Sequence, residues 1–377
     1  MINIGFTGDF CPWGRTEERF LKGNWKDSFT QIKPFFDENQ LNVIDLECPL
    51  TRYDTKIEKT GPHLKALPET AEILSHLNCK LVATANNHFK DYGWEGMQET
   101  YTALKKFNIT SVGSGSSWAE ASKPFLANID EIKVAFINVT DKEWSTTENE
   151  QPGCNPMDPV LVFNAIQEAA KKADFVIIIA HGGHEHFNLP SPRIKKLYRF
   201  FIDAGAAAVI GHHTHIISAY EVYKNAPIFY SLGNFCFDSP DKRNLHWNFG
   251  MLLRLKLETG KAIVFEALYV EQYNQHPIIK AVDVSKEKEL TTMQSELNEL
   301  MNDDKALELT FKEYTHSLNS LMNTWIEPYT GKFLPSLQKK GLLPTLMRAK
   351  KKRLLTVLIQ CDAHRDVLLD AIDSRKH

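Results

Sequence analysis

Short apolar runs alternate with amphipathic segments from the first residues to about residue 231. Runs rich in β-branched and aromatic residues predict strands at Ile2–Thr7, Asn42–Leu46, Leu81–Ala85, Lys133–Val139, Asp174–Ala180, Ala206–Ile210 and Pro227–Ser231. Segments with the 3.6-residue period of helices lie between them, at Leu67–Leu77, Gly93–Phe107, Pro159–Lys172 and Pro192–Ala204. This alternation of strands and helices predicts an α/β layered fold.

The pattern changes in the last third of the chain. Met251–Glu258 and Lys261–Val270, separated by Thr259 and Gly260, predict an antiparallel hairpin. Beyond about Ser285 the sequence becomes charged and helical, with helices predicted at Lys286–Leu300 and Leu307–Leu321. The chain is therefore predicted to hold a catalytic domain of residues 1–284 and a helical C-terminal extension of residues 285–377.

Composition narrows the possible partners. The 377 residues carry a formal net charge of −3, so no overall basic field attracts nucleic acid or anionic membrane. Residues 1–10 lack a charged leader before a long apolar stretch, and no later apolar run reaches membrane-spanning length. The six cysteines are scattered, unlike a disulfide framework. We expect a cytoplasmic protein with reduced thiols, no transmembrane segment and no nucleic-acid partner.

Polar clusters stand at or just after the ends of the predicted strands. They are Gly8-Asp9, Asp45-Leu46-Glu47, Asn86-Asn87-His88, His181 to His186, and Gly211 to His215. Strand ends of layered folds commonly hold ligands, and this mixture of oxygen and nitrogen donors suits manganese, zinc or iron rather than calcium. One or two divalent ions are predicted. Paired ions about 3.5–4 Å apart need a bridging carboxylate, and Glu47 is the candidate.

The order of these clusters resembles the calcineurin-like metallophosphoesterases. Several blocks are similar to the CapA family of poly-gamma-glutamate capsule biosynthesis proteins: NVIDLECPL at 42–50, ANNHFKDYG at 85–93, VGSGSSWAEASKP at 112–124, the segment His181–His186, IGHHTH at 210–215 and FYSLGNF at 229–235. The resemblance covers roughly residues 1–270. The resemblance implies a layered sandwich of two mixed β-sheets flanked by helices, followed by an α-helical C-terminal extension.

The same resemblance implies individual roles. Asp9, Glu47 and His215 would hold one ion, and Glu47, Asn87, His181 and His213 would hold the second. His88 matches the position that protonates the leaving oxygen or stabilises its charge. Four further residues of the clusters are expected to line the site, where they could orient the ligands: His184, Glu185, His212 and Asn86.

Two positions depart from the wider phosphoesterase pattern. Cys11 stands where a histidine ligand is usual, and Glu47 replaces an aspartate. The first ion therefore lacks one nitrogen ligand unless Cys11 supplies a thiolate, so a site with a single ion is an open alternative. The loop Gly61–Lys65 offers a second open choice, because His63 or Lys65 could meet an anionic substrate there or lie in an ordinary exposed loop.

The functional prediction is a metal-dependent hydrolase that uses metal-activated hydroxide. Its substrate would be a phosphoester or an anionic capsule-type polymer such as poly-gamma-glutamate. The alternative is a non-catalytic, metal-binding assembly component of capsule polymer synthesis or export. Proteins of the capsule machinery are possible partners in either case.

Overall fold

The computed structural model describes residues 1–147, 150–318, 329, 333–360 and 364. The chain divides into two compact units, Met1–Glu308 and Leu309–His377. Every predicted site residue lies in the first unit. This unit also includes α8 (Val284–Asn302), whose Leu290 is buried in the core. The division at residue 284 into catalytic domain and extension stays a prediction.

The larger sheet has eight strands. Their order is β16-β15-β14-β1-β2-β3-β4, and β13 also pairs with β1. Strands β1 to β4 are parallel to one another, whereas β14 to β16 run antiparallel, so the sheet is mixed. The strands are β1 (Ile2–Cys11), β2 (Leu41–Leu46), β3 (Cys79–Ala83), β4 (Thr110–Val112), β13 (Asn234–Phe237), β14 (Phe249–Leu257), β15 (Val264–Gln272) and β16 (Ile279–Ala281).

The smaller sheet has six strands in the order β11-β12-β10-β9-β7-β6. Its four central strands are parallel and the two outer ones antiparallel. The strands are β6 (Phe125–Ile129), β7 (Ile132–Thr140), β9 (Phe175–His181), β10 (Ala208–His212), β11 (Tyr220–Tyr223) and β12 (Ala226–Phe229). A separate short pair consists of β5 (Ser114–Gly115) and β8 (Gly153–Cys154).

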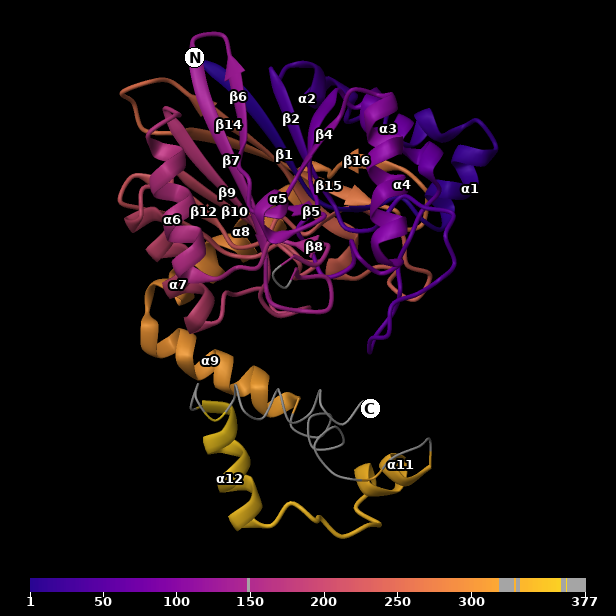
Figure 1. The fold of residues 1–377 in the computed structure, drawn as a ribbon, viewed down its shortest axis with the longest axis vertical. Helices are drawn as coiled ribbons and strands as arrows, with labels where there is room; N and C mark the ends of the chain where they lie inside the picture. The colour runs from indigo at the N-terminus through magenta and orange to yellow at the C-terminus, as the bar shows by residue number, and fades with distance from the viewer. Residues whose placement is uncertain (148–149, 319–328, 330–332, 361–363, 365–377) are drawn as a thin grey trace. The chain divides into compact units, whose positions relative to one another are not determined.

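The two sheets pack face to face over an apolar core. Phe6 of β1 and Phe136 of β7 meet there with ring centroids 6.4 Å apart, and Ile177 of β9 belongs to the same cluster. A second apolar cluster lies between the larger sheet and the helices α2 to α4. In Figure 1, α3 and α4 cover the larger sheet, whereas α6 and α7 cover the smaller one. The predicted layered sandwich of two mixed sheets flanked by helices is confirmed.

Local sequence explains where the flanking helices begin. Asp158 accepts hydrogen bonds from two backbone amides at the start of α6, and Ser191 accepts one at the start of α7. Proline follows each cap, in the first turn where its missing N–H costs nothing. The α-helices are α1 (Arg15–Leu21), α2 (Lys33–Asp37), α3 (Ala71–His76), α4 (Gly93–Lys106), α5 (Trp118–Ala121), α6 (Pro159–Ala170), α7 (Pro192–Asp203), α8, α9 (Asp304–Ser317), α11 (Leu334–Lys339) and α12 (Ala349–Gln360).

Most predicted elements are present within a few residues of their expected bounds. Strand β1 is the main exception, because it continues to Cys11 and so places Asp9 inside a strand rather than after one. The strands that were not predicted include β6, which forms a hairpin with the predicted strand β7, and the short strands β4 and β13. The expected end of the last helix at Leu321 lies outside the described residues. Among the described helices, none is both long and apolar enough to cross a membrane.

Candidate metal centre

The carboxyl ends of strands from both sheets meet at one edge of the sandwich. In the larger sheet, Asp9 of β1 lies opposite Asp45 of β2. In the smaller sheet, His181 ends β9 and lies opposite His212, which ends β10. Parallel strands present their carboxyl ends at the same edge, so residues more than a hundred positions apart in sequence converge there.

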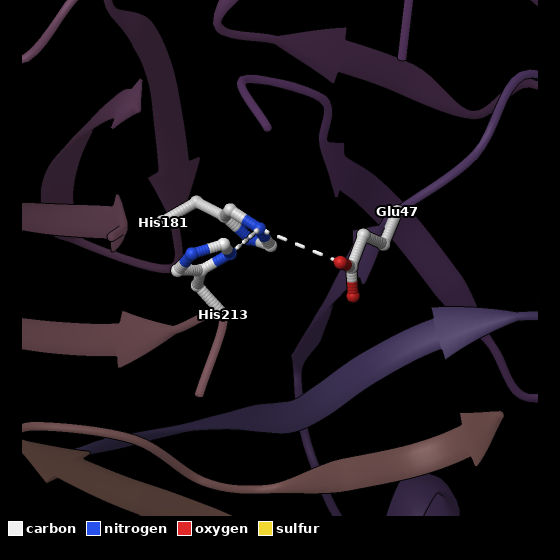
Figure 2. Close-up of side chains that lie close together, drawn as sticks. All are labelled: Glu47, His181 and His213. Carbon is white, nitrogen blue, oxygen red and sulfur yellow. Dashed lines mark hydrogen bonds and ion pairs between the residues drawn. The ribbon is translucent and has the colours of Figure 1, made fainter. Parts of the chain in front are cut away.

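Three side chains gather around the Nε2 atom of His181. This nitrogen lies 3.1 Å from Asn87 Oδ1, 3.2 Å from His213 Nδ1 and 3.6 Å from Glu47 Oε1. Figure 2 shows the two imidazole rings together, with the Glu47 carboxylate facing them. Two ligand atoms about 2.1 Å from one tetrahedral ion lie about 3.4 Å apart. These residues, called here the second half of the centre, therefore have the spacing of ligands around one cation.

The first half of the centre consists of Asp9, Glu47 and His215. Ligand atoms of these three residues all lie within 4.8 Å of one another. His215 Nε2 is 3.6 Å from Glu47 Oε1, and its Nδ1 is 3.1 Å from Asp9 Oδ2. The same Glu47 oxygen is 3.6 Å from His181 Nε2, so it lies between the two halves. Glu47 therefore has the position expected of a carboxylate that bridges two ions.

Glu47 provides the test of whether these residues suit a cation. Its side chain is fully buried, and neither carboxylate oxygen has a hydrogen-bond partner among the described residues. Burial, with the charges of Asp9 and Asp45, raises the pKa of Glu47 well above its usual value. A buried, unpaired carboxylate is costly to ionise, and a divalent ion offsets that cost. The donor set fits such an ion, although the assignment of individual ligands stays a prediction.

The imidazoles of the second half are neutral, as metal ligands must be. Burial lowers the pKa of His181 and His213 to about 3. His181 Nδ1 lies 3.2 Å from Asp45 Oδ2, and a proton shared there leaves the Nε2 lone pair facing Asn87 and Glu47. Asp45 thus contacts a candidate ligand, although the sequence analysis left it without a role. Its position two residues before Glu47, on the same face of the strand end, was the available signal.

His215 of the first half and the nearby His212 have raised rather than lowered pKa values. Burial alone would lower the pKa of His215, but the adjacent Asp9 carboxylate outweighs it and raises that pKa. Burial is likewise outweighed at His212, whose pKa is raised by Asp45 and Asp9. His212 Nδ1 lies 3.1 Å from Asp9 Oδ1, so this residue, predicted to line the site, contacts a candidate ligand directly.

Strained backbone aims the histidines that follow β10. His213 has φ of 91° and His215 has φ of 61°, both in the left-handed region that non-glycine residues rarely occupy. Such conformations cost about 1–3 kcal/mol each and persist where the surrounding structure enforces them. Gly211 precedes this turn because a Cβ there would lie 2.3 Å from the backbone oxygen of Tyr230. The turn thereby directs two rings toward one centre.

His88 lies beside the centre in a hydrogen-bonded loop. Its Nδ1 is 2.8 Å from Asp91 Oδ2, and its backbone N–H donates to Asn86 Oδ1 at 3.1 Å. Asn86 Nδ2 in turn donates to the backbone oxygen of Leu46 at 2.8 Å, tying the loop to the end of β2. Burial lowers the pKa of His88, although Asp91 opposes this effect. Asn86 therefore orients His88 from the edge of the site.

Two residues expected to line the site are less buried than the candidate ligands. His184 is half-buried, and Glu185 is exposed. Burial alone would raise the pKa of Glu185, but the charges of His215 and His213 outweigh it and lower that pKa. Glu185 is therefore in electrostatic contact with both halves without belonging to any ligand group found among the described residues.

Neither Cys11 nor the loop Gly61–Lys65 supplies a residue to the ligand groups found among the described residues. Cys11 is buried in the apolar core cluster, and no ligand group formed by the described residues contains a cysteine. His63 Nε2 contacts the backbone oxygen of Ile57, and Lys65 Nζ contacts Asp54 and the backbone of Tyr53. All of these partners lie on the same loop, so neither side chain is bonded to a candidate ligand.

Most of the chain matches a known protein family. Residues 3–239 match the family described as "Bacterial capsule synthesis protein PGA_cap". The chain belongs to this family. The predicted resemblance to the CapA capsule biosynthesis proteins is thereby confirmed, and the PGA_cap region contains every predicted site residue.

Two relatives of this chain carry the CapA name. The "PGA biosynthesis protein CapA" of Bacillus subtilis (strain 168) is 34% identical over 245 residues, which are 63% of this chain and 64% of that protein. The chain thus spans less than two thirds of that relative's length. The "Capsule biosynthesis protein CapA" of Bacillus anthracis is 29% identical over 293 residues, covering 75% of this chain and 71% of that protein.

Solved structures show more distant likeness. A 5'-nucleotidase from Candida albicans SC5314 aligns with a TM-score of 0.42 and 14% identity, covering 84% of this chain and 58% of that chain. A hypothetical protein from Thermus thermophilus aligns with a TM-score of 0.46 and 14% identity, covering 72% of this chain and 99% of that chain.

Proposed function

We propose that the protein is a metal-dependent hydrolase in the metabolism of an anionic capsule-type polymer. Its substrate would be a phosphoester, or the backbone of an acidic polymer such as poly-gamma-glutamate. The observation that carries this proposal is Glu47, a fully buried carboxylate with no hydrogen-bond partner among the described residues, 3.6 Å from two imidazole nitrogens. Membership of the PGA_cap family supports the choice of polymer.

Each ligand residue has its own role in this proposal. When bound, divalent manganese, zinc or iron supplies Lewis acidity and activates an attacking water. Glu47 would join the two halves, while His181, held at Nδ1 by Asp45, would present Nε2 to the second. His212 would orient Asp9 in the first half. The strand ends fix all of these groups, so the site needs little rearrangement to bind its ions.

His88 would move the proton that the leaving group requires. Because Asp91 holds Nδ1, the Nε2 atom is the nitrogen that exchanges a proton with the substrate. Burial lowers the pKa of His88, which makes its imidazolium a stronger acid when it forms. The neighbouring Asp91 carboxylate stabilises that imidazolium. Geometry and charge together support a general acid at this position.

The second candidate is a non-catalytic, metal-binding assembly component of capsule polymer synthesis or export. The names of the Bacillus relatives favour it, because both refer to biosynthesis rather than hydrolysis. Proteins of the capsule machinery would then be the partners. For both candidate functions we propose a cytoplasmic location, which cell fractionation tests.

A hydrolysis screen separates the two candidates. Protein loaded with zinc or manganese is assayed against phosphoesters and gamma-glutamyl peptides, as wild type and as His88→Ala. We expect His88→Ala to keep its metal and to lose about 10²- to 10⁴-fold in turnover. His276→Ala, at an exposed histidine, serves as the control and should match wild type. Metal-loaded wild type without hydrolysis would favour the assembly role, whereas equal hydrolysis by His88→Ala would show only that His88 is not the general acid.

A further inference from the structure

A buried lysine lies behind the proposed general acid. Lys59 belongs to the loop between β2 and α3, and only 3% of its side chain is exposed. Its Nζ forms an ion pair with Asp91 Oδ1 and lies 3.2 Å from His88 Nδ1. Asp91 itself is fully buried. The three side chains therefore form a closed cluster, in which Lys59 contacts no candidate metal ligand.

Hydrogen-bond chemistry fixes the direction of these contacts. His88 Nδ1 cannot donate a proton to Asp91 and at the same time accept one from Lys59. The Asp91 Oδ2 atom is closer, at 2.8 Å, and a carboxylate is the stronger acceptor, so Nδ1 donates to it. Lys59 then makes its bond with the other oxygen of Asp91. The imidazole is left with Nε2 as its free nitrogen.

The same carboxylate also fastens the loop. The backbone N–H of Leu64 donates to Asp91 Oδ2 at 2.8 Å, and that of Ile57 donates to the Asp91 backbone oxygen at 3.1 Å. Burying an ion pair usually gains little stability, because desolvating both charges offsets their attraction. These two hydrogen bonds already hold the loop in place. A buried lysine at this point is therefore better explained by what it does to Asp91 and His88.

We propose that Lys59 is a positioning residue of the hydrolytic site. It holds the Asp91 carboxylate in place, and through Asp91 it holds the tautomer and the ring orientation of His88. This inference rests on the proposed function, because it assigns Lys59 a part in the proton transfer made by His88. It also identifies which cation of the loop serves the site, since Lys65 is bonded to Asp54 and the backbone of Tyr53 instead.

Kinetics of a double-mutant cycle test the proposal. We expect Lys59→Met to lower kcat about 10- to 100-fold, the range found when residues that orient a metal-site group are removed, with KM and metal content unchanged. The matched control Lys65→Met, in the same loop, should behave as wild type. In a His88→Ala background, Lys59→Met should cost nothing further, because its effect passes through His88. An equal loss in both backgrounds, or a raised KM with unchanged kcat, would overturn the proposal.

A second readout does not require hydrolysis. In zinc-loaded protein with ¹⁵N-labelled histidine, long-range ¹H–¹⁵N spectra report which ring nitrogen of His88 carries the proton. Wild type and Lys59→Arg, which keeps the cation, should show the Nδ1–H tautomer, whereas Lys59→Met should show a mixture. An unchanged tautomer in Lys59→Met contradicts the role of Lys59. Absence of hydrolysis by wild type, with the tautomer shift present, would instead refute only the proposed function.

Discussion

The two halves of the metal centre share Glu47 but differ in how their other ligands are prepared. In the second half, burial keeps His181 and His213 neutral, and Asp45 fixes the orientation of His181. In the first half, Asp9 raises the pKa of His215 against the effect of burial, so a proton competes with a cation for this ring. The imidazoles of the second half are therefore better suited to bind a cation than that of the first half. The distance from Glu47 Oε1 to the nearest imidazole nitrogen is nevertheless 3.6 Å in both halves.

The first half is further weakened as a metal site because position 11 holds a cysteine instead of a histidine. Cys11 lies in the apolar core, where burial and its neighbour Cys48 raise the pKa of its thiol well above the usual value. A buried neutral thiol does not replace an imidazole as a ligand. The first half thus has fewer nitrogen ligands and a more easily protonated one, so we expect it to bind its ion more weakly than the second half does.

Removing the shared residue should have the largest effect. Glu47→Gln takes away the negative charge that both halves use, and the neutral amide is a weaker ligand for divalent ions. We expect both ions to be lost and hydrolysis to fall by at least about 100-fold. Elemental analysis of the purified variant measures the first effect. Retention of two ions would show that Glu47 is not the bridge.

Removing one imidazole from each half should separate them. His213→Ala is expected to abolish binding at the second half, and His215→Ala at the first half, each leaving the other ion in place. Because the second half is the better prepared, His213→Ala should lower the tightest measured affinity, whereas His215→Ala should spare it. Titration of each variant with metal in a calorimeter measures the affinities of the two halves. Loss of both ions in either variant would mean that the halves bind as one cooperative unit.

A smaller effect is expected at the residue that orients His181. Asp45→Asn keeps the size of the side chain but weakens its bond to His181 Nδ1. The affinity of the second half should fall by about 10- to 100-fold, with little change in the first half. Competition with a chelator of known affinity provides the measurement. If the first half weakened equally, Asp45 would be acting through Asp9, its neighbour across the strands.

The halves should also respond differently to acid. A raised pKa means that His215 takes up a proton at a higher pH than an ordinary imidazole, whereas His181 and His213, with pKa values of about 3, stay neutral. As the pH falls below neutrality, the first half should therefore release its ion before the second. Metal release followed across a pH series tests the order. Simultaneous release, or release from the second half first, would contradict it.

The smallest effect is expected at Cys11. Cys11→Ser should leave the number of bound ions and their affinities unchanged, because the thiol lies in the core rather than among the ligand atoms. A modest loss of stability from placing a hydroxyl in an apolar core is expected, within the usual range of about 0.5–3 kcal/mol. Metal analysis together with thermal unfolding measures both quantities. Loss of one ion would convert Cys11 into a ligand and favour zinc.

The sequence predicted those features that depend on local pattern. Apolar runs marked the central strands, and polar residues at their ends marked the edge where the site lies. Its spacing from Glu47 could have marked Asp45, but its contact with His181, which lies on the other sheet, could not be read from the sequence. Lys59 was missed for a similar reason, since its loop has no periodic pattern and its partner Asp91 is distant in sequence. Such pairings depend on tertiary packing.

Anomalous diffraction from crystals grown with zinc tests the central claim most directly. The account predicts a strong peak at the second half, about 2.0–2.3 Å from ligand atoms of Glu47, Asn87, His181 and His213. A weaker peak should lie at the first half, with Glu47 between the two. Zinc-containing crystals without a peak beside Glu47, or with zinc bound only at other residues, would contradict the account.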